Sequence, residues 1–253
     1  MTPLGSDAPS GSAPSPAQAG TTAPAPVLHN SVLERVGTEI AQGILPAGSV
    51  LTLARLEEES GVSRTVIREV VRILESMGMV ESRRRVGVTV LPVSAWNVLD
   101  PQVIRWRLSG SERVAQLNRL TEMRLALEPT AARLAAARAT PEVANELLEL
   151  ARQLRTLGEK GEGNQQPYLD ADIAFHALLL AASGNDMLAS LHGIVTEVLA
   201  GRTDLGLSPA DPAPVSFDNH EGVAQAILDR DPDAAENYAR GVVMEVWQEL
   251  SEI

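Results

Sequence analysis

Three helical patterns followed by a basic hairpin occupy residues 31–90, and this order most restricts the possible fold. The first pattern repeats apolar residues at near-helical spacing, at Val32, Val36, Ile40 and Ile44. Two further helical patterns cover 52–60 and 63–77, and Gly61 between them suits a tight turn. Alternating or β-branched residues then flank Arg83–Arg85, which is typical of a short hairpin. Together these elements predict a winged helix-turn-helix over residues 30–92.

In that topology the third helix enters the DNA major groove. Its early exposed positions are Ser63, Arg64, Thr65 and Arg68. Arginine reads guanine bidentately, and hydroxyls and backbone N–H groups at a helix start bind phosphate. Arg83, Arg84, Arg85 and Gly87 of the wing are expected to contact phosphates or the minor groove. The alternative for these arginines is an ordinary solvated face.

The formal charge of −12 argues against DNA binding until it is divided along the chain. Residues 30–92 carry eight arginines and eight acidic residues, whereas residues 93–253 carry a net charge of −11. The arginines of the first part cluster at 64–72 and 83–85, and local field governs phosphate contact more than net charge does. The acidic balance therefore belongs to the second half and does not exclude DNA as a partner.

Composition excludes several other classes. Residues 1–29 are rich in Pro, Ala, Ser and Gly, which predicts a disordered tail. The chain has no cysteine, so disulfides and thiolate metal sites are excluded. No apolar run approaches the roughly 20 residues that a membrane span needs, and no secretory signal is recognisable. A cytoplasmic location without membrane association is expected.

The helix-turn-helix also carries a family resemblance. Gly61-Val62-Ser63-Arg64-Thr65-Val66-Ile67-Arg68-Glu69-Val70 resembles the "GVSRTPVREAL" recognition-helix motif of the GntR superfamily. Val66 stands where proline is common, and the segment 51–56 replaces the usual "LPSERxLA" with one residue fewer. The arginine of that family segment often contacts DNA. The resemblance leaves open whether Arg55 has this role.

Beyond the wing, residues 93–111 read as a linker and a first helix, with Trp96 as an anchor and Asp100 as a cap. Residues 112–253 show only helical patterns, which predicts an all-α antiparallel bundle with sites between facing helices. The expected spans are 101–108, 112–139, 141–157, 166–182, 185–200, 216–229 and 232–251. The fold class is therefore mostly α, with β-structure confined to the wing.

Within this bundle, Asp172 and His176 are spaced i, i+4 and share one helix face in apolar surroundings. His220 and His192 lie on other predicted helices. A carboxylate and imidazoles that converge inside a bundle suit a metal or an anion. The alternative is a hydrogen-bonded core role, which is the more common one for a buried histidine when spacing alone is considered.

The second half is similar to the FCD effector domain of the FadR subfamily. The resemblance rests on Asp172-Ile173-Ala174-Phe175-His176, on the segment 124–135 and on the segment 218–235. It implies a divalent metal, zinc or nickel, held by an Asp, a His four residues later and two further His. Asp172, His176 and His220 match three of these ligands, while Val242 stands near the fourth position. Both a three-ligand metal site and direct effector binding by these groups remain open.

The effector itself is expected to be a small carboxylate. Arg124 on an inward helix face provides a bidentate anion clamp, although an ion pair with Glu128 is the alternative. Thr196, Asn219 and Tyr238 are candidates for effector hydroxyl groups. The linker resembles that of FadR-subfamily members responding to hexonic sugar acids such as galactonate or gluconate. Other members sense lactate, pyruvate, acyl-CoA or amino acids, and fold does not fix the ligand.

The resulting hypothesis is a homodimeric repressor on a palindromic operator, released by its effector, with activation as an alternative sign. A metal-dependent hydrolase using Asp172, His176 and His220 is the rival class, but no nucleophile or base is placed by motif. A third class is a DNA-architectural protein without a ligand. The arginine-rich first domain favours a regulator rather than an enzyme.

Overall fold

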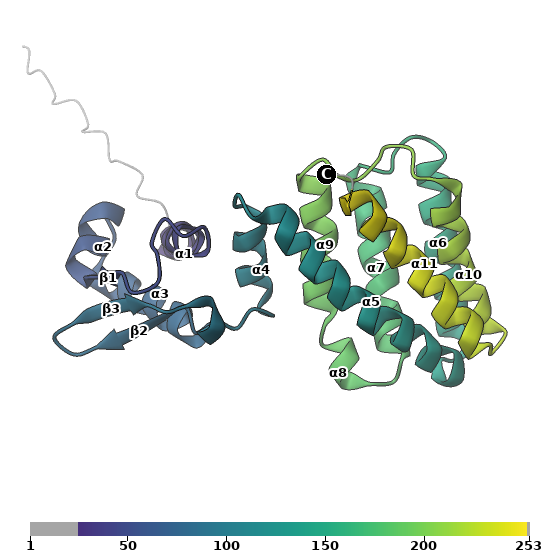
Figure 1. Ribbon diagram of the computed structural model, residues 1–253, viewed down its shortest axis with the longest axis horizontal. Helices are drawn as coiled ribbons and strands as arrows, with labels where there is room; N and C mark the ends of the chain where they lie inside the picture. Colours follow the sequence, from purple (N-terminus) through teal and green to yellow (C-terminus); the bar gives the residue numbers. More distant parts are fainter. Residues whose placement is uncertain (1–24, 252–253) are drawn as a thin grey trace, which may run out of the picture.

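The computed structural model describes residues 25–251 as a DNA-binding head and a helical body joined through one short helix (Figure 1). The head comprises α1 (Ala25–Ala41), β1 (Val50–Leu51), α2 (Leu53–Ser60), α3 (Arg64–Ser76), β2 (Val80–Arg83) and β3 (Gly87–Val90). Its antiparallel sheet has the order β1-β3-β2. The predicted winged helix-turn-helix is confirmed. Residues 1–24 of the predicted tail lie outside the described residues, and 25–29 belong to α1.

Local chemistry explains the turn between α2 and α3. Thr52 caps α2, because its side chain accepts a hydrogen bond from the Arg55 backbone N–H at 3.2 Å. Gly61 ends the helix with φ 65°, a left-handed conformation that other residues adopt at a cost. Ser63 is at the N-cap position of α3 and has extended backbone, but it makes no side-chain capping bond. The turn therefore depends more on Gly61 than on a cap at Ser63.

The joining helix α4 (Pro101–Leu108) has one face in each half of the molecule. Trp106 packs into the head core and donates its indole N–H to Glu34 of α1 at 2.6 Å. Its ring lies so close to Gly37 that an added Cβ would stand 2.4 Å from it. Leu108 instead belongs to a core cluster of the body. Because α4 contributes to both cores, the head is docked on the body rather than tethered by a free linker.

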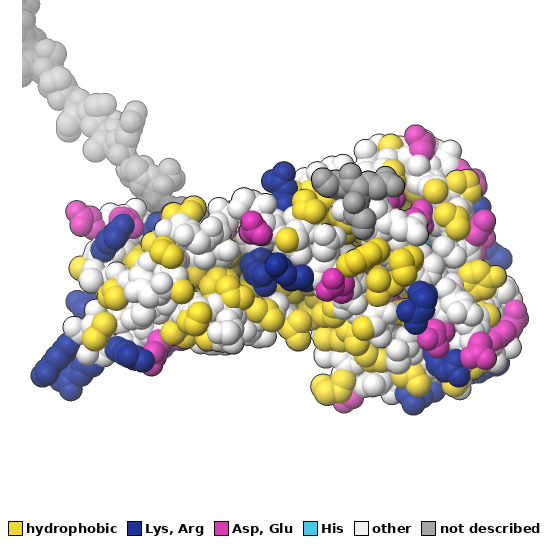
Figure 2. All heavy atoms as spheres, in the orientation of Figure 1, with side chains coloured by type: hydrophobic (Ala, Val, Ile, Leu, Met, Phe, Trp, Pro, Cys, Tyr) yellow, Lys and Arg dark blue, Asp and Glu magenta, His cyan; other side chains and the backbone are white. Residues whose placement is uncertain are grey.

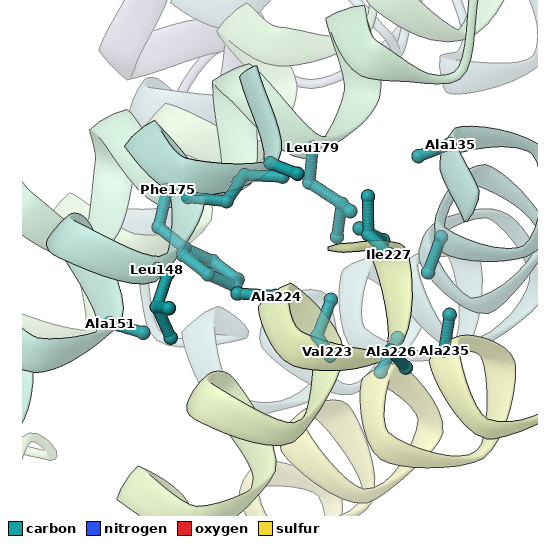
Figure 3. Packing of buried hydrophobic residues seen from close by; sticks show 14 of the residues in the cluster. Ala135, Leu148, Ala151, Phe175, Leu179, Val223, Ala224, Ala226, Ile227 and Ala235 are labelled. Atoms are coloured by element: carbon teal, nitrogen blue, oxygen red, sulfur yellow. The ribbon is translucent and has the colours of Figure 1, made fainter. Parts of the chain in front are cut away.

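The body is all helical in its described residues, as predicted. Its helices are α5 (Arg113–Arg138), α6 (Pro141–Gly158), α7 (Gln166–Ala182), α8 (Asp186–Ala189), α9 (His192–Asp204), α10 (Pro214–Leu228) and α11 (Pro232–Ser251). Phe175 and Leu179 of α7 pack against Ile227 of α10 and small alanines of α5 and α11 (Figure 3). None of the described helices has the length and apolarity to cross a membrane.

One body helix differs from the prediction. The single helix expected over 185–200 is two helices, α8 and α9, separated at Ser190 and Leu191. Gly201, predicted to end it, lies inside α9 instead. A Cβ there would stand 2.7 Å from Leu108 Cδ1, so this glycine allows α9 to approach α4 closely. Its role is packing rather than helix termination.

Candidate functional site

Most of the residues predicted to contact DNA lie at the start of α3 and in the wing. Arg64, Thr65 and Arg68 are all exposed on the first two turns of α3. Arg83, Arg84 and Arg85 are exposed at the β2–β3 turn, where Figure 2 shows dark blue side chains gathered at the end of the molecule. Exposed guanidinium groups in such an arrangement suit contacts to bases and backbone phosphates, which remain predictions for these residues.

Arg55 and Gly87, which are also predicted to contact DNA, lie outside α3 and the arginine cluster of the wing. Arg55 is exposed on α2, but its guanidinium donates to Glu59 at 2.6 Å, and this bond raises the pKa of Arg55. Gly87 opens β3 with φ 116°, and an added Cβ would stand 2.7 Å from the Leu51 carbonyl oxygen. Gly87 is thus required by the sheet itself. Its predicted contact with DNA remains a prediction, as does that of Arg55.

Five helices of the body enclose a cavity of about 50 Å³. A single water needs on the order of 10–15 Å³ in this measure, so the space exceeds what one bound water requires. It opens between α5, α7, α9, α10 and α11 and the loop before α10. The polar residues that line it are Arg124, Tyr168, Asp172, His176, Arg202, Thr203, Ser208, Ser216, His220, Glu245 and Glu249.

Asp172, His176 and His220 converge at this cavity from α7 and α10. One ligand atom from each lies within 4.8 Å of the others. Asp172 Oδ1 is 3.3 Å from His176 Nε2 and 3.6 Å from His220 Nε2. His220 donates its Nδ1–H to the Ser216 carbonyl oxygen at 2.7 Å, and His176 Nδ1 lies 2.8 Å from Glu128. Both rings therefore turn Nε2 toward Asp172, the orientation that second-shell partners give to metal-ligating histidines.

Arg124 lies beside this cluster and is almost completely buried, with 1% of its surface exposed. Its Nε donates to Glu128 at 2.6 Å, so the Arg124–Glu128 ion pair expected as the alternative is present. Nη2 lies 3.3 Å from His176 Nε2. Among the described residues, the buried Nη1 has no hydrogen-bond partner. An anion in the cavity would supply the missing acceptor.

Burial and charge act against each other in this cluster. Burial alone disfavours the Glu128 carboxylate, but the charges of Arg124 and His176 hold its pKa at about 2. Burial likewise disfavours the His176 imidazolium, yet the charge of Glu128 and hydrogen bonds to Asp172 and Glu128 raise its pKa to about 9. The pKa of Asp172 is lowered, because the neighbouring His176 and His220 side chains outweigh the effect of its burial. The lowered pKa values favour the ionised form of both carboxylates, of which Asp172 lines the cavity and Glu128 is paired with Arg124.

Comparison with known proteins decides the family. Residues 28–90 match the domain described as "Bacterial regulatory proteins, gntR family", and residues 119–243 match the FCD domain. The chain belongs to the GntR family. The uncharacterized regulator YieP of Escherichia coli K12 is 31% identical over 82% of this chain and 89% of its own length. The galactonate operon transcriptional repressor of the same organism is 32% identical, with 86% and 94% covered.

One solved structure supports the fold independently. Lar, which controls the agr system of Listeria monocytogenes, has a TM-score of 0.58 at 16% identity, with 89% of this chain and 97% of that one covered. The chain is therefore a ligand-responsive transcription regulator with a GntR head and an FCD body. Its family consists of regulators rather than enzymes, which removes the hydrolase alternative.

The remaining predicted effector residues lie away from the cavity lining of this GntR regulator. Thr196 on α9 donates its hydroxyl to the His192 carbonyl oxygen at 3.0 Å. The Asn219 side chain lies against Gly241, and Tyr238 is 43% exposed beside Gly222. Val242 does line the cavity, at the position anticipated for a fourth ligand. Contacts of the first three with effector remain predictions.

Sequence reasoning missed part of the lining. The sequence analysis does not single out Arg202, Glu245 and Glu249, yet all three line the cavity, and Arg202 and Glu245 have buried polar atoms without a hydrogen-bond partner among the described residues. Tyr168 is buried there too, and its pKa is raised, mainly by burial and by the charge of Asp172. Glu245 and Glu249 share a face with Val242 at helical spacing, and that pattern alone could have signalled them.

Proposed function

We propose that this GntR regulator is a homodimeric repressor released from a palindromic operator by a hexonic sugar acid such as galactonate or gluconate. The observation that carries the effector assignment is the buried Arg124 guanidinium with its unpartnered Nη1 at the cavity. A carboxylate is the bidentate partner that such a guanidinium prefers. A relative that represses the galactonate operon favours a sugar acid over lactate or an amino acid.

A divalent metal, zinc or nickel, is part of the proposal. Asp172, His176 and His220 would hold it, since their donor atoms cluster and the buried His220 Nε2 has no hydrogen-bond partner within the described structure. Three protein ligands leave coordination positions for water or for an effector oxygen. A bound metal would supply a positive charge for the effector carboxylate. The chain's own contribution is the orientation of both imidazoles by Glu128 and Ser216.

The route from cavity to DNA runs through α9 and α4 in this proposal. Arg202 and Thr203 of α9 line the cavity, and Glu197 of the same helix accepts two hydrogen bonds from Arg105 of α4. The α4 helix is anchored in the head by Trp106. An effector that favours a different position of α9 would therefore alter the spacing of the two heads of a dimer. Coupling requires only that the two states bind effector unequally.

The effector assignment is tested with D-galactonate and with galactitol, its neutral polyol counterpart. Operator is selected from a randomised duplex library and followed by fluorescence anisotropy, while calorimetry measures ligand binding. Galactonate is expected to bind and release the DNA, and galactitol to do neither at tenfold higher concentration. Equal responses to the two compounds, or release by neither galactonate nor gluconate, would contradict a carboxylate-sensing site.

The DNA-binding face yields a separate prediction. Arg64→Ala is expected to cost about 1–3 kcal/mol of operator binding and to relax preference at one base position. Arg84→Ala at the wing should weaken binding to all sequences and reduce the salt dependence by about one phosphate contact. Arg152→Ala, an exposed arginine of the body, is the matched control and should leave anisotropy titrations unchanged. A footprint without two-fold symmetry would argue against the dimer.

A further inference from the structure

The wall of the cavity formed by α9 and α11 contains polar atoms that the protein itself leaves unpaired. Arg202 Nε and Glu245 Oε2 are both buried and without a hydrogen-bond partner in the part of the chain that the structure describes. Arg202 Nη2 donates to Glu249 Oε2 at 2.6 Å, so this guanidinium is paired at Nη2 but not at Nε. A ligand that pairs both atoms must carry a hydrogen-bond acceptor for the buried donor and a hydrogen-bond donor for the buried acceptor.

The charge of this wall differs from that of the Arg124 region. Arg202 is the one cation among the wall's three charged side chains, and the other two are the carboxylates of Glu245 and Glu249. Burial and the neighbouring Glu249 charge raise the pKa of Glu245, so additional negative charge beside it is disfavoured. A second carboxylate on a ligand would satisfy Arg202 Nε but would face two glutamates. An alkyl tail would leave both polar atoms unpaired.

A hydroxyl group both accepts and donates a hydrogen bond, so a hydroxylated carbon chain satisfies Arg202 Nε and Glu245 Oε2 together. We infer that Glu245, with the Arg202–Glu249 pair, selects the polyhydroxylated tail of a monocarboxylic acid and rejects the corresponding diacid. This inference rests on the proposed function, in which Arg124 takes the single carboxylate. It adds to that function a specificity for the rest of the ligand, in which Glu245 on the α9–α11 wall discriminates a monoacid from a diacid.

The test begins with the unmodified protein and four six-carbon acids measured by titration calorimetry. D-Gluconate and D-galactonate carry hydroxyls and one carboxylate, D-glucarate replaces the terminal hydroxyl by a second carboxylate, and hexanoate has no hydroxyls. Gluconate and galactonate are aldonates. The one that binds more tightly is expected to have at least tenfold higher affinity than glucarate or hexanoate. This comparison needs no variant and is therefore independent of any folding defect.

Glu245→Gln then isolates the discriminating charge. The amide keeps the shape of the side chain but can donate to a carboxylate, so the aldonate-to-glucarate affinity ratio is expected to fall at least tenfold. Glu146→Gln, at an exposed position of α6, is the matched control and should retain the original ratio. Thermal unfolding of each variant shows whether the fold is retained.

The outcomes separate this inference from the function on which it rests. Binding of aldonates with glucarate or hexanoate bound equally well would overturn the inference while leaving a carboxylate-sensing regulator in place. An unchanged ratio in folded Glu245→Gln would do the same. Absence of binding by all four acids would overturn both. A large ratio in the unmodified protein that collapses only in Glu245→Gln would support the role of the wall.

Discussion

Glu128→Leu is expected to lower the free energy of unfolding by about 3–5 kcal/mol, because it leaves a buried cation without its counter-charge. Glu128 and Arg124 are each 1% exposed, and their carboxylate and guanidinium form a hydrogen-bonded pair at 2.6 Å. Glu128 also lies 2.8 Å from His176 Nδ1 and holds that ring in place. The loss should be measured by urea unfolding followed by circular dichroism in metal-free buffer.

The double variant Arg124→Met/Glu128→Leu distinguishes a lost charge partner from lost packing. Replacing both members of a buried pair by apolar residues of similar volume is often neutral or stabilising. We therefore expect the double variant to recover most of the stability lost by Glu128→Leu, while losing response to carboxylate effectors. Glu122→Gln, exposed on the same helix, is the control for changes in α5 itself. A double variant as unstable as the single one would show that packing, not charge, dominates.

Most of the fold could be predicted because its signals are local. Gly61 between two amphipathic patterns marks the turn of the head. Proline or threonine marks the residues at which α4, α6 and α11 begin. Strand β1 has only two residues, too few for an alternating pattern, and it forms because Val50 pairs with Thr89 far along the chain. The helix end expected at residue 200 was wrong because Gly201 packs against Leu108, which lies even farther away in the sequence.

The residues of the candidate site could likewise be predicted where the signal is local in sequence, and not where it depends on distant contacts. Asp172 and His176 share a helix face, so their cooperation was readable from spacing, and the family resemblance added His220. Contacts between helices were not readable in this way. Thr196 was predicted as an effector contact because of its hydroxyl, but that hydroxyl donates a hydrogen bond to the His192 carbonyl oxygen of the same helix. Helical spacing could have placed Glu245 on the face of Val242, but the burial of the polar atoms of Arg202 and Glu245 depends on tertiary packing, since charged residues on helices are usually solvated.

Val242→His is expected to tighten zinc binding by about 100-fold or more. Val242 lines the cavity beside Asp172, His176 and His220, which already supply three donor atoms within 4.8 Å of one another. Changes to groups that only orient a metal ligand alter affinity about 10- to 100-fold, so an added direct ligand should reach at least the upper end. Competition with a chromogenic chelator measures the affinity. Thermal stability at saturating zinc should rise in parallel, because tighter binding to the folded state stabilises it by mass action.

Met244→His is the matched control, since this residue is 37% exposed on the same helix and does not line the cavity. It adds a histidine without adding a donor to the cluster, so its zinc affinity should equal that of the unmodified chain. His176→Ala in the Val242→His background removes one donor and should return the affinity toward the original value. If Val242→His binds zinc no more tightly than Met244→His, the three natural donors are not arranged around a metal. The cluster would then act on the effector directly, through hydrogen bonds from its imidazoles.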